Sequence, residues 1–352
     1  MKKLFFILIL VPFILLGQNL TFSDGPYIFI KKDRLVEKSL INGKVITKDL
    51  EINRYDTIYY PAKSRFSNVN KIAALSDIHG QFDLLVALLK NNKIIDNNLD
   101  WSFNKGHLVI VGDVFDRGDK VNQILWLFYK LEIQAKNMGG RLHFLLGNHE
   151  YMVLQKDLRY INRKYRFSAK SLDLKYDELY GKETILGRWL RSKPTIIKIN
   201  NTVFTHGGVS KKFIKNRGVD FDEINDLMRN NIDFSPKKMK SRDYYKLYNS
   251  EESLVWYRDY FKEYGDDLSE KDISEILKNL NSKHIVVGHC PYDEIIPLYN
   301  NRIFGVDSSI QKGIYGEVLF IENDQFSRGK LNGKLIRIES VSYTHLTLPT
   351  IR

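Results

Sequence analysis

The chain has 352 residues, of which 43% are hydrophobic and 12% aromatic, and this is enough for one large core with attached segments. Its formal net charge of +12 favours anionic partners in general, without selecting among phosphate esters, nucleic acid and acidic membranes. We interpret the basic runs at 211–216 and 235–242 as solvated loops, so no specific nucleic-acid partner is expected. The single cysteine, Cys290, excludes a disulfide within the chain.

The first residues, MKKLFFILILVPFILLGQNL, have the pattern of a secretory signal. Two lysines precede an apolar stretch at 4–16, and the small Gly17 stands near a plausible cleavage point. The apolar stretch is short compared with the roughly 20 residues that cross a bilayer. We therefore predict a signal peptide at 1–18, an exported protein that is periplasmic or secreted, and no stable membrane span after cleavage. The alternative is an uncleaved anchor.

The segment 19–66 is predicted to form an N-terminal β extension. Its short β-type runs, which turn residues separate, lie at 27–30, 43–48 and 56–60. Such runs favour a small sheet that precedes the main domain.

Between 67 and 325 an apolar strand, a polar cluster and often a helix recur in this order. The predicted strands are 71–75, 107–111, 141–146, 201–205 and 284–288. Helices are expected at 81–90, at 121–136 before two glycines, and after a capping signal at Ser269 and Asp272. Alternating strands and helices indicate an α/β core with parallel pairs, which binds ligands at the carboxyl ends of its strands.

Two segments, at about 151–195 and 211–267, interrupt the alternation of strands and helices. We interpret both as helical or looped insertions that cap the strand ends. The alternative is that they are solvated additions at the periphery of the domain.

The end of the chain, 340–352, has no turn signal and no periodicity. It resembles a peptide read through from sequencing-adapter sequence, so we interpret it as non-native. His345 is therefore excluded from any site.

Polar residues follow five of the predicted strands and could hold metal ions. The candidate ligands are Asp77, His79, Asp113, Asn148, His206 and His289. Carboxylate, imidazole and amide donors suit Mn, Fe or Zn, so the expected cofactor is a pair of divalent ions. Two such ions could share Asp113 and clamp an in-line displacement, and a water that bridges them would supply hydroxide near neutral pH.

The stretch GDVFDRGD, at 112–119, contains more charge than a turn requires. Arg117 could bind two phosphate oxygens through its forked guanidinium. Asp116 could orient His149, which as an imidazolium would protonate the leaving group as general acid. Asp119 is predicted to be the N-cap of the following helix.

The motifs SDIHG, GDVFDRG, GNHE, HGG and GHC occur in this order. They resemble the calcineurin-like metallophosphoesterases, and more narrowly the phosphoprotein-phosphatase branch. The exported start, together with DGPYIF, GNHEYM and VWYRDY, is similar to the bacterial Shewanella-like protein phosphatases. The resemblance covers residues 24–325. It implies an α/β fold, a four-layer αββα sandwich with a dinuclear centre, to which the cap insertions are added.

The resemblance also implies how the site residues divide their roles. One metal would take Asp77, His79 and Asp113, and the other would take Asp113, Asn148, His206 and His289. Arg117 matches the phosphate-binding arginine, Asn148 would border the phosphate, and Arg258 in WYRDY would be a second phosphate clamp. His149 and Asp116 match the acid pair.

Two positions depart from the family pattern. Ser76 stands where many members have glycine, a change that a strand end tolerates. Cys290 follows His289, and we interpret it as a small buried packing residue, with metal ligation as the alternative.

Each candidate residue has a structural alternative when taken alone. An aspartate can cap a helix, and a lone histidine is more often hydrogen-bonded than metal-bound. His107, His143 and His284 begin or precede strands, so we expect structural or surface roles for them. The coincidence of five clusters at five strand ends favours the catalytic interpretation.

Three functions fit these residues. The first is a metal-dependent phosphatase that hydrolyses phosphomonoesters, acting on a phosphorylated protein (Ser/Thr or Tyr) or a small phosphomonoester. The second is a phosphodiesterase or a hydrolase of nucleotides or dinucleoside polyphosphates, which the GHCPY element favours. The third is a phosphate-binding module without catalysis. The complete ligand set argues against the third function, and Arg117 with the acid pair favours the first over the second.

Overall fold

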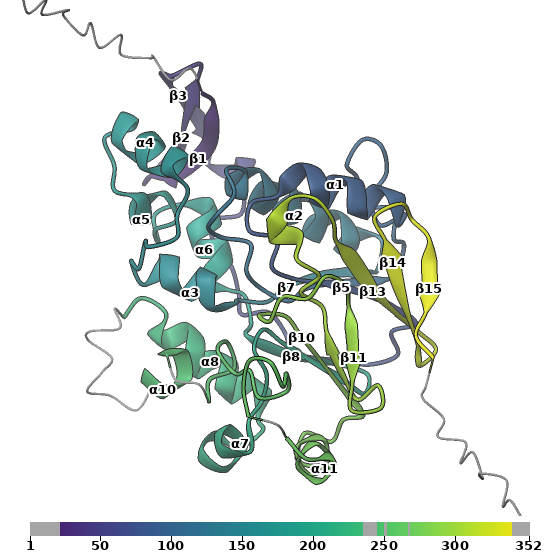
Figure 1. Ribbon diagram of the computed structural model, residues 1–352. Helices are drawn as coiled ribbons and strands as arrows, with labels where there is room; N and C mark the ends of the chain where they lie inside the picture. The colour runs from purple at the N-terminus through teal and green to yellow at the C-terminus, as the bar shows by residue number, and fades with distance from the viewer. Residues whose placement is uncertain (1–21, 235–244, 250–251, 267, 340–352) are drawn as a thin grey trace, which may run out of the picture.

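The computed structural model describes residues 22–234, 245–249, 252–266 and 268–339 (Figure 1). The predicted signal peptide at 1–18 and the tail at 340–352 lie outside these described residues. Among the described helices, none combines the length and the apolar character that a membrane crossing requires.

The first sheet has six strands in the order β15-β14-β13-β5-β6-β7. Their bounds are β5 (Lys71–Leu75), β6 (His107–Ile110), β7 (Arg141–Phe144), β13 (Glu317–Glu322), β14 (Gln325–Lys330) and β15 (Leu335–Arg337). Three of the predicted strands, β5, β6 and β7, belong to this sheet and are parallel neighbours. Strand β13 pairs antiparallel with β5, so the sheet continues past residue 325, the expected end of the domain.

The second sheet also has six strands, in the order β11-β12-β10-β9-β8-β4. Their bounds are β4 (Arg65–Phe66), β8 (Ile196–Ile199), β9 (Thr202–Thr205), β10 (His284–Val287), β11 (Ile296–Leu298) and β12 (Ile303–Gly305). The predicted strands β9 and β10 are parallel neighbours, and β12 is parallel to β10 on its other side. The carboxyl ends of β9, β10 and β12 therefore meet at one edge.

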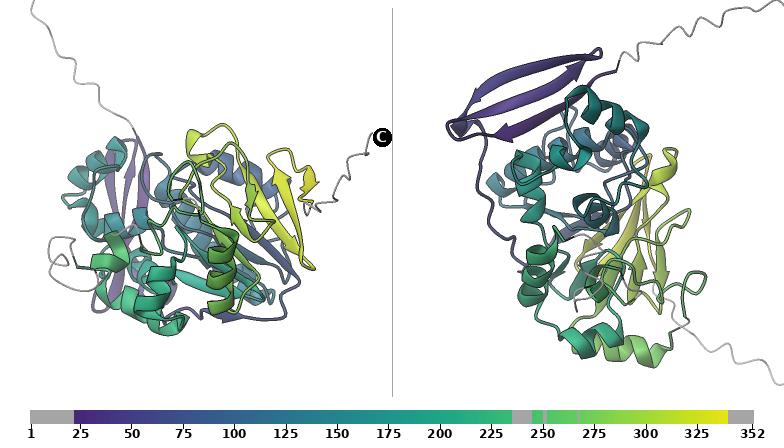
Figure 2. Two further views of the ribbon diagram at one scale, coloured as in Figure 1. Left: turned by 60° about the horizontal axis from the view of Figure 1, so that its bottom comes forward. Right: turned by 90° about the vertical axis from the view of Figure 1, so that its left-hand side faces the viewer.

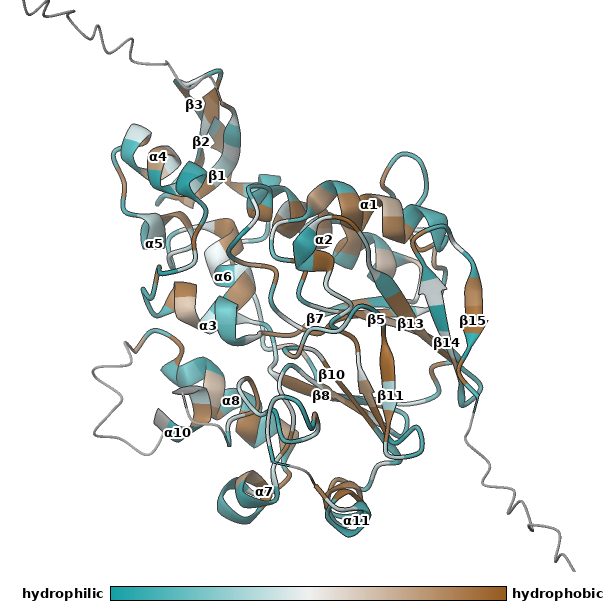
Figure 3. Ribbon diagram, viewed as in Figure 1, coloured by the Kyte–Doolittle hydropathy of each residue, from teal (hydrophilic) through white to brown (hydrophobic). Residues whose placement is uncertain are grey.

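The two sheets pack face to face. A buried apolar cluster contains residues of both sheets, among them Ala74 and Val109 of the first and Ile197, Phe204 and Val286 of the second. In Figure 3 the ribbons of β8, β10 and β13 are mostly brown, the colour of hydrophobic residues. Burial of both faces explains why the strands are short continuous apolar runs and do not alternate with polar residues.

Helices cover the outer faces of the sandwich (Figure 1). Those beside the first sheet are α1 (Phe82–Asn91) and α2 (Val121–Asn137). Those beside the second are α7 (Lys211–Arg217), α8 (Phe221–Asn231) and α11 (Glu270–Asn279). The four layers confirm the predicted αββα sandwich.

Helix termini confirm one predicted cap and correct another. At the start of α11, Ser269 and Asp272 form the predicted capping box, in which the side chain of each accepts the backbone N–H of the other. The prediction that Asp119 caps α2 is wrong, because the N-cap position is Lys120. The carbonyl of Asp119 instead accepts hydrogen bonds from Lys164 and Tyr165, which tie this loop to the first insertion.

The first insertion is helical. It contains α3 (Asn148–Leu154), α4 (Arg163–Ser171), α5 (Tyr176–Leu179) and α6 (Ile185–Arg191). It contacts the loop after β6, because the backbone N–H of Arg117 donates to the carbonyl of Tyr160 at 3.0 Å. The described part of the second insertion contains α7, α8 and the short helix α10 (Tyr245–Asn249).

The N-terminal segment forms a separate three-stranded antiparallel sheet (Figure 2). Its strands are β1 (Asp24–Ile30), β2 (Arg34–Ile41) and β3 (Lys44–Glu51). The strand expected at 56–60 is absent from this described segment, because Ile58 and Tyr60 are exposed and no strand lies beside them. The hydroxyl of Tyr59 instead pairs with that of Tyr129 on α2 at 3.0 Å.

Candidate metal centre and acid pair

The residues predicted as metal ligands are brought together at one edge of the sandwich. Asp77 and His79 follow β5, Asp113 follows β6, Asn148 begins α3 after β7, His206 follows β9 and His289 follows β10. All six are buried. Donor atoms within 4.8 Å of one another form two groups that share Asp113; these are His79, Asp113 and His149, and Asp113, His206 and His289.

The backbone of this region is strained. Left-handed φ angles between 45° and 72° occur at Asp77, His79, Asp113, Asp116, Arg117 and His289. Such angles are uncommon for residues other than glycine, and each costs of the order of 1–3 kcal/mol, which functional sites tolerate.

Two histidines are held with one ring nitrogen facing the cluster. The Nδ1–H of His79 donates to the carbonyl of Phe115 at 2.7 Å, and the Nδ1–H of His206 donates to that of Val111, also at 2.7 Å. The Nε2 atoms of the two rings lie 3.7 Å and 3.2 Å, respectively, from Oδ2 of Asp113. A backbone acceptor behind a histidine fixes the tautomer in this way at metal sites.

Asp113 occupies the centre of the cluster. Its Oδ2 also lies 3.8 Å from Nε2 of His149, so three imidazoles surround this one oxygen. Its other oxygen, Oδ1, accepts the backbone N–H of His149 at 3.0 Å. This is the placement that a ligand shared by two ions requires.

Asp77 and Asn148 contact different histidines of the cluster. Oδ1 of Asn148 is 2.9 Å from Nε2 of His206. Oδ2 of Asp77 accepts the backbone N–H of His289 at 2.9 Å, and its Oδ1 is 3.9 Å from Nε2 of His79. His149, which was not predicted as a ligand, lies in one donor group with His79 and Asp113.

The electrostatics of the cluster fit bound cations. Burial acts to lower the pKa of His206, but Asp113 and Asp77 outweigh it and raise the pKa to about 10. Burial acts to raise the pKa of Asp113, but His206 and His149 hold it well below the ordinary value. The buried carboxylates thus need positive charge beside them, and oxygen and nitrogen donors from several strand ends suit divalent metal ions.

Asp307 is a buried carboxylate that our sequence interpretation missed. It follows β12, the parallel neighbour of β10, and is 1% exposed. Its Oδ1 accepts the backbone N–H of Ser309 at 3.0 Å, whereas Oδ2 has no hydrogen-bond partner among the described residues. Burial and the nearby Asp77 raise its pKa well above the ordinary value. The signal was present, since Asp307 is an acid directly after an apolar strand.

Glu150, the last residue of the GNHE motif, organises the backbone beneath the cluster. Its fully buried carboxylate accepts backbone N–H groups at 2.7–3.2 Å from Asp113, Val114, Phe115 and Gly147. Burial and the charge of Asp113 raise the pKa of Glu150 to about 7. The sequence contains the residue but does not show that its acceptors serve two loops at once.

His149 and Asp116 form the predicted pair. Nδ1 of His149 lies 2.6 Å from Oδ2 of Asp116. Burial acts to lower the pKa of His149, but the Asp113 charge and the Asp116 hydrogen bond outweigh it and raise the pKa above its ordinary value. These contacts favour the protonated imidazole, and its Nε2 lies 3.8 Å from Oδ2 of Asp113.

Both candidate phosphate-binding arginines lie beside the cluster. Arg117 is exposed, and its guanidinium donates to the side chain of Gln311, which our sequence interpretation did not single out. Arg258 is partly buried, and its Nε–H donates to Nε2 of His289 at 2.9 Å. The two guanidinium groups therefore come from separate segments, the loop after β6 and the second insertion.

His107, His143, His284 and Cys290 lie outside the two donor groups that the described residues form. Nε2 of His143 is 3.0 Å from Nδ1 of His107, and Nδ1 of His284 is 2.8 Å from the carbonyl of Asn301. Cys290 is buried in the apolar core, and burial raises the pKa of its thiol to about 12. These contacts agree with the structural roles predicted for all four residues.

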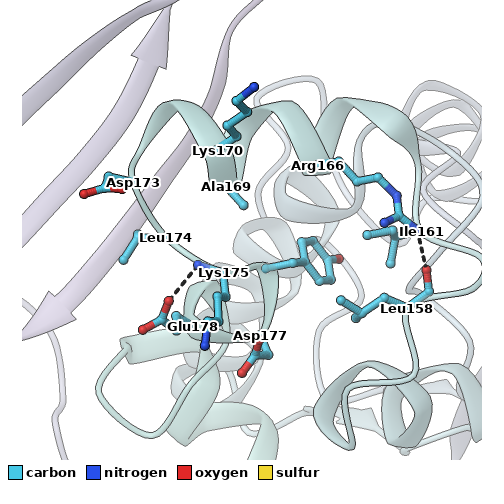
Figure 4. A pocket seen from close by; sticks show the side chains of 11 residues that line it. Leu158, Ile161, Arg166, Ala169, Lys170, Asp173, Leu174, Lys175, Asp177 and Glu178 are labelled. Carbon is cyan, nitrogen blue, oxygen red and sulfur yellow. Dashed lines mark hydrogen bonds between the residues drawn. The ribbon is translucent and has the colours of Figure 1, made fainter.

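A hollow of about 670 Å³ lies within the first insertion (Figure 4). Leu158, Ile161 and Tyr176 line it together with lysines and acids of α4 and α5. It shares no residue with the metal-ligand candidates, so we do not regard it as the reaction site.

Comparisons with known proteins agree with this geometry. Residues 70–293 match the family model described as calcineurin-like phosphoesterase. The chain is 28% identical to "Shewanella-like protein phosphatase 1" of Plasmodium berghei over 316 residues, which are 88% of this chain and 82% of the relative. It is 24% identical to "Shewanella-like protein phosphatase 2" of Arabidopsis thaliana over 310 residues, 74% of this chain and 78% of the relative.

A solved structure shares the whole arrangement. The cold-active protein-tyrosine phosphatase of a psychrophilic Shewanella species superimposes with a TM-score of 0.86 and 37% sequence identity. The match covers 91% of this chain and 100% of that structure. Taken with the family model and the strand-end cluster, it shows that this chain is a hydrolase that belongs to the calcineurin-like phosphoesterase family.

Proposed function

We propose that the protein is a metal-dependent phosphomonoesterase that acts on phosphorylated proteins. The observation that carries this proposal is the His149–Asp116 pair, 2.6 Å apart and buried next to Asp113 at the centre of the cluster. A proton donor at that place serves a leaving group that departs as an alkoxide or phenoxide. The relatives named protein phosphatases support the substrate class.

Two divalent cations complete the proposed site. One would bind to Asp77, His79 and Asp113, and the other to Asp113, Asn148, His206 and His289. When bound, a pair of Mn²⁺, Fe or Zn ions supplies a nucleophile from water at neutral pH and neutralises phosphate charge. The short distances from Asp113 to the three imidazoles support it as the shared ligand.

The protein's own residues bind the substrate and supply the proton that the leaving group takes up. Arg117 and Arg258 bind phosphate oxygens from two sides, and Asn148 borders the phosphate. His149 gives its Nε2 proton to the departing oxygen, and Asp116 holds the ring by Nδ1 and stabilises its positive charge. The carboxylate of Glu150 holds the loops that contain Asp113 and Gly147 together, because it accepts a backbone N–H from each of these two residues.

Hydrolysis of a diester or of a dinucleoside polyphosphate is the competing activity. A comparison of para-nitrophenyl phosphate with bis(para-nitrophenyl) phosphate, both with added Mn²⁺, separates the two. We expect kcat/KM for the monoester to exceed that for the diester by at least about 10-fold, because two guanidinium groups favour the dianionic monoester over the monoanionic diester. Faster cleavage of the diester would contradict the proposed function.

We also propose that the protein acts outside the cytoplasm, in the periplasm or as a secreted enzyme. The signal-like pattern at 1–18 supports export. Cys290 is the single cysteine, so no disulfide within the chain would form on export. Fractionation of cells that express the full chain, with N-terminal sequencing of the exported form, tests this proposal.

A further inference from the structure

Tyr160, in the first insertion, is fixed to the loop that carries the phosphate-binding arginine. Its carbonyl accepts the backbone N–H of Arg117 at 3.0 Å. Two residues later, the side-chain amide of Asn162 donates to the carbonyl of Arg117 at 2.8 Å. The segment 160–162 therefore holds Arg117 by both its backbone N–H and its carbonyl, and the backbone position of Tyr160 is set relative to the site.

The neighbours of Tyr160 anchor it from the opposite side. Leu158 and Ile161 line the hollow in the insertion (Figure 4). The carbonyl of Leu158 accepts a hydrogen bond from the guanidinium of Arg166 at 3.0 Å. Apolar contacts and a hydrogen bond thus hold this segment down, although Tyr160 itself remains exposed.

The ring of Tyr160 lies beside the proton donor. Its centroid is 5.5 Å from that of the His149 imidazole, with an angle of 50° between the planes. The guanidinium of Arg159 lies 5.5 Å from the ring centroid, and Asp157 fixes Arg159 through paired hydrogen bonds of 2.8 Å and 2.7 Å. Tyr160 is nevertheless 49% exposed, so part of its surface is available to a ligand.

The ring of Tyr160 is thus held next to His149 and Arg159 by a backbone that is fixed on both sides, and the residue stays partly open to solvent. Whatever group accepts the proton of His149 must come within hydrogen-bond distance of that imidazole. The leaving group therefore lies next to Tyr160, whereas the phosphate lies towards Arg117. A planar apolar leaving group would find a contact surface there, and a small hydroxyalkyl group would not reach it.

The geometry points to Tyr160 as a specificity-determining residue, which packs against an aromatic leaving group and favours aryl phosphomonoesters, such as a phosphorylated tyrosine side chain, over alkyl ones. This inference rests on the proposed phosphomonoesterase function and on His149 as the proton donor. Edge-to-face or offset contact between the two rings supplies the preference. Contacts with His149 and Arg159 place the ring beside the site before a ligand binds.

The test compares matched substrates in matched variants. Tyr160→Leu removes the ring but keeps an apolar side chain, Tyr160→Phe keeps the ring, and Phe167→Leu removes another exposed aromatic of the same insertion as a control. The substrates are two peptides of one sequence that contain phosphotyrosine or phosphoserine. We expect Tyr160→Leu to lower kcat/KM for the phosphotyrosine peptide by about 3- to 10-fold and to change that for the phosphoserine peptide by less than about 2-fold. Tyr160→Phe and Phe167→Leu should leave both values unchanged.

A binding measurement separates ring contact from proton transfer. Phenylphosphonate and methylphosphonate are not hydrolysed, so their inhibition constants do not depend on His149 as an acid. Tyr160→Leu should raise the inhibition constant of phenylphosphonate by the same factor by which it lowers kcat/KM for the phosphotyrosine peptide. It should leave the inhibition constant of methylphosphonate unchanged. Equal losses on both peptides, or an unchanged constant for phenylphosphonate, would overturn the inference. If the wild-type protein hydrolyses neither peptide but cleaves diesters, the proposed function fails instead.

Discussion

Replacement of Asp113 by asparagine is expected to abolish metal-dependent turnover. The variant keeps the shape of the side chain and the oxygen that accepts the His149 backbone N–H, but it removes the negative charge next to three imidazoles. Loss of an outer partner of a metal ligand costs about 10- to 100-fold in affinity or activity. Loss of the shared ligand itself should therefore lower kcat/KM for para-nitrophenyl phosphate by more than about 100-fold.

The control for this variant is Asp96→Asn, because Asp96 is an exposed acid outside the cluster. Circular dichroism and thermal unfolding of both variants separate loss of activity from loss of the fold. Retention of more than about a tenth of the wild-type rate by Asp113→Asn would show that the ions do not share this ligand.

Replacement of His149 by asparagine is expected to slow the hydrolysis of substrates with poor leaving groups more than that of substrates with good ones. A general acid contributes about 10²- to 10⁴-fold when the departing oxygen is strongly basic. The para-nitrophenolate ion leaves without protonation, so His149→Asn should lower the rate for an alkyl phosphate far more than that for para-nitrophenyl phosphate. The measurement is kcat for both substrates at saturating Mn²⁺ in wild type and variant.

The metal content of the same variant tests the alternative role of His149. Its Nε2 lies in one donor group with His79 and Asp113, so its position alone also suits a ligand. As a proton donor held by Asp116, His149 should be dispensable for metal binding. If His149→Asn loses bound metal and both substrates slow equally, His149 is a ligand and the acid must be sought elsewhere.

Much of the arrangement of the metal-ligand candidates could be predicted, because residues of ligand type stand directly after the predicted parallel strands. Every candidate ligand follows a strand that the apolar runs had already located, and parallel strands bring their carboxyl ends to one edge. Asp77, Asp113 and His289 are far apart in the chain, yet this rule about strand ends is enough to predict that they lie close together.

Other features depend on contacts that no local pattern records. Glu150 accepts hydrogen bonds from the loops after both β6 and β7. Gln311 accepts a hydrogen bond from Arg117, which is 194 residues away in the sequence. Tyr160 resembles any other aromatic of its insertion until its backbone is seen paired with Arg117. Asp119 has the composition of an N-cap, but its carbonyl is bound to α4 instead.

The N-terminal segment shows a different limit of sequence interpretation. The run at 56–60 has β-forming residues, but a strand requires a partner, and here Tyr59 packs on α2. The sequence interpretation missed strand β2, the central strand of this sheet, because its charged residues obscure the apolar run.

Metal stoichiometry tests the central claim most directly. The full chain is loaded with Mn²⁺, passed through a gel-filtration column to remove free ions, and assayed for metal by inductively coupled plasma mass spectrometry. The ligand set described here predicts two ions per molecule, and removal of these ions with a chelator should eliminate hydrolysis until Mn²⁺ is restored. A folded protein that binds one ion or none while it hydrolyses phosphomonoesters would contradict the account.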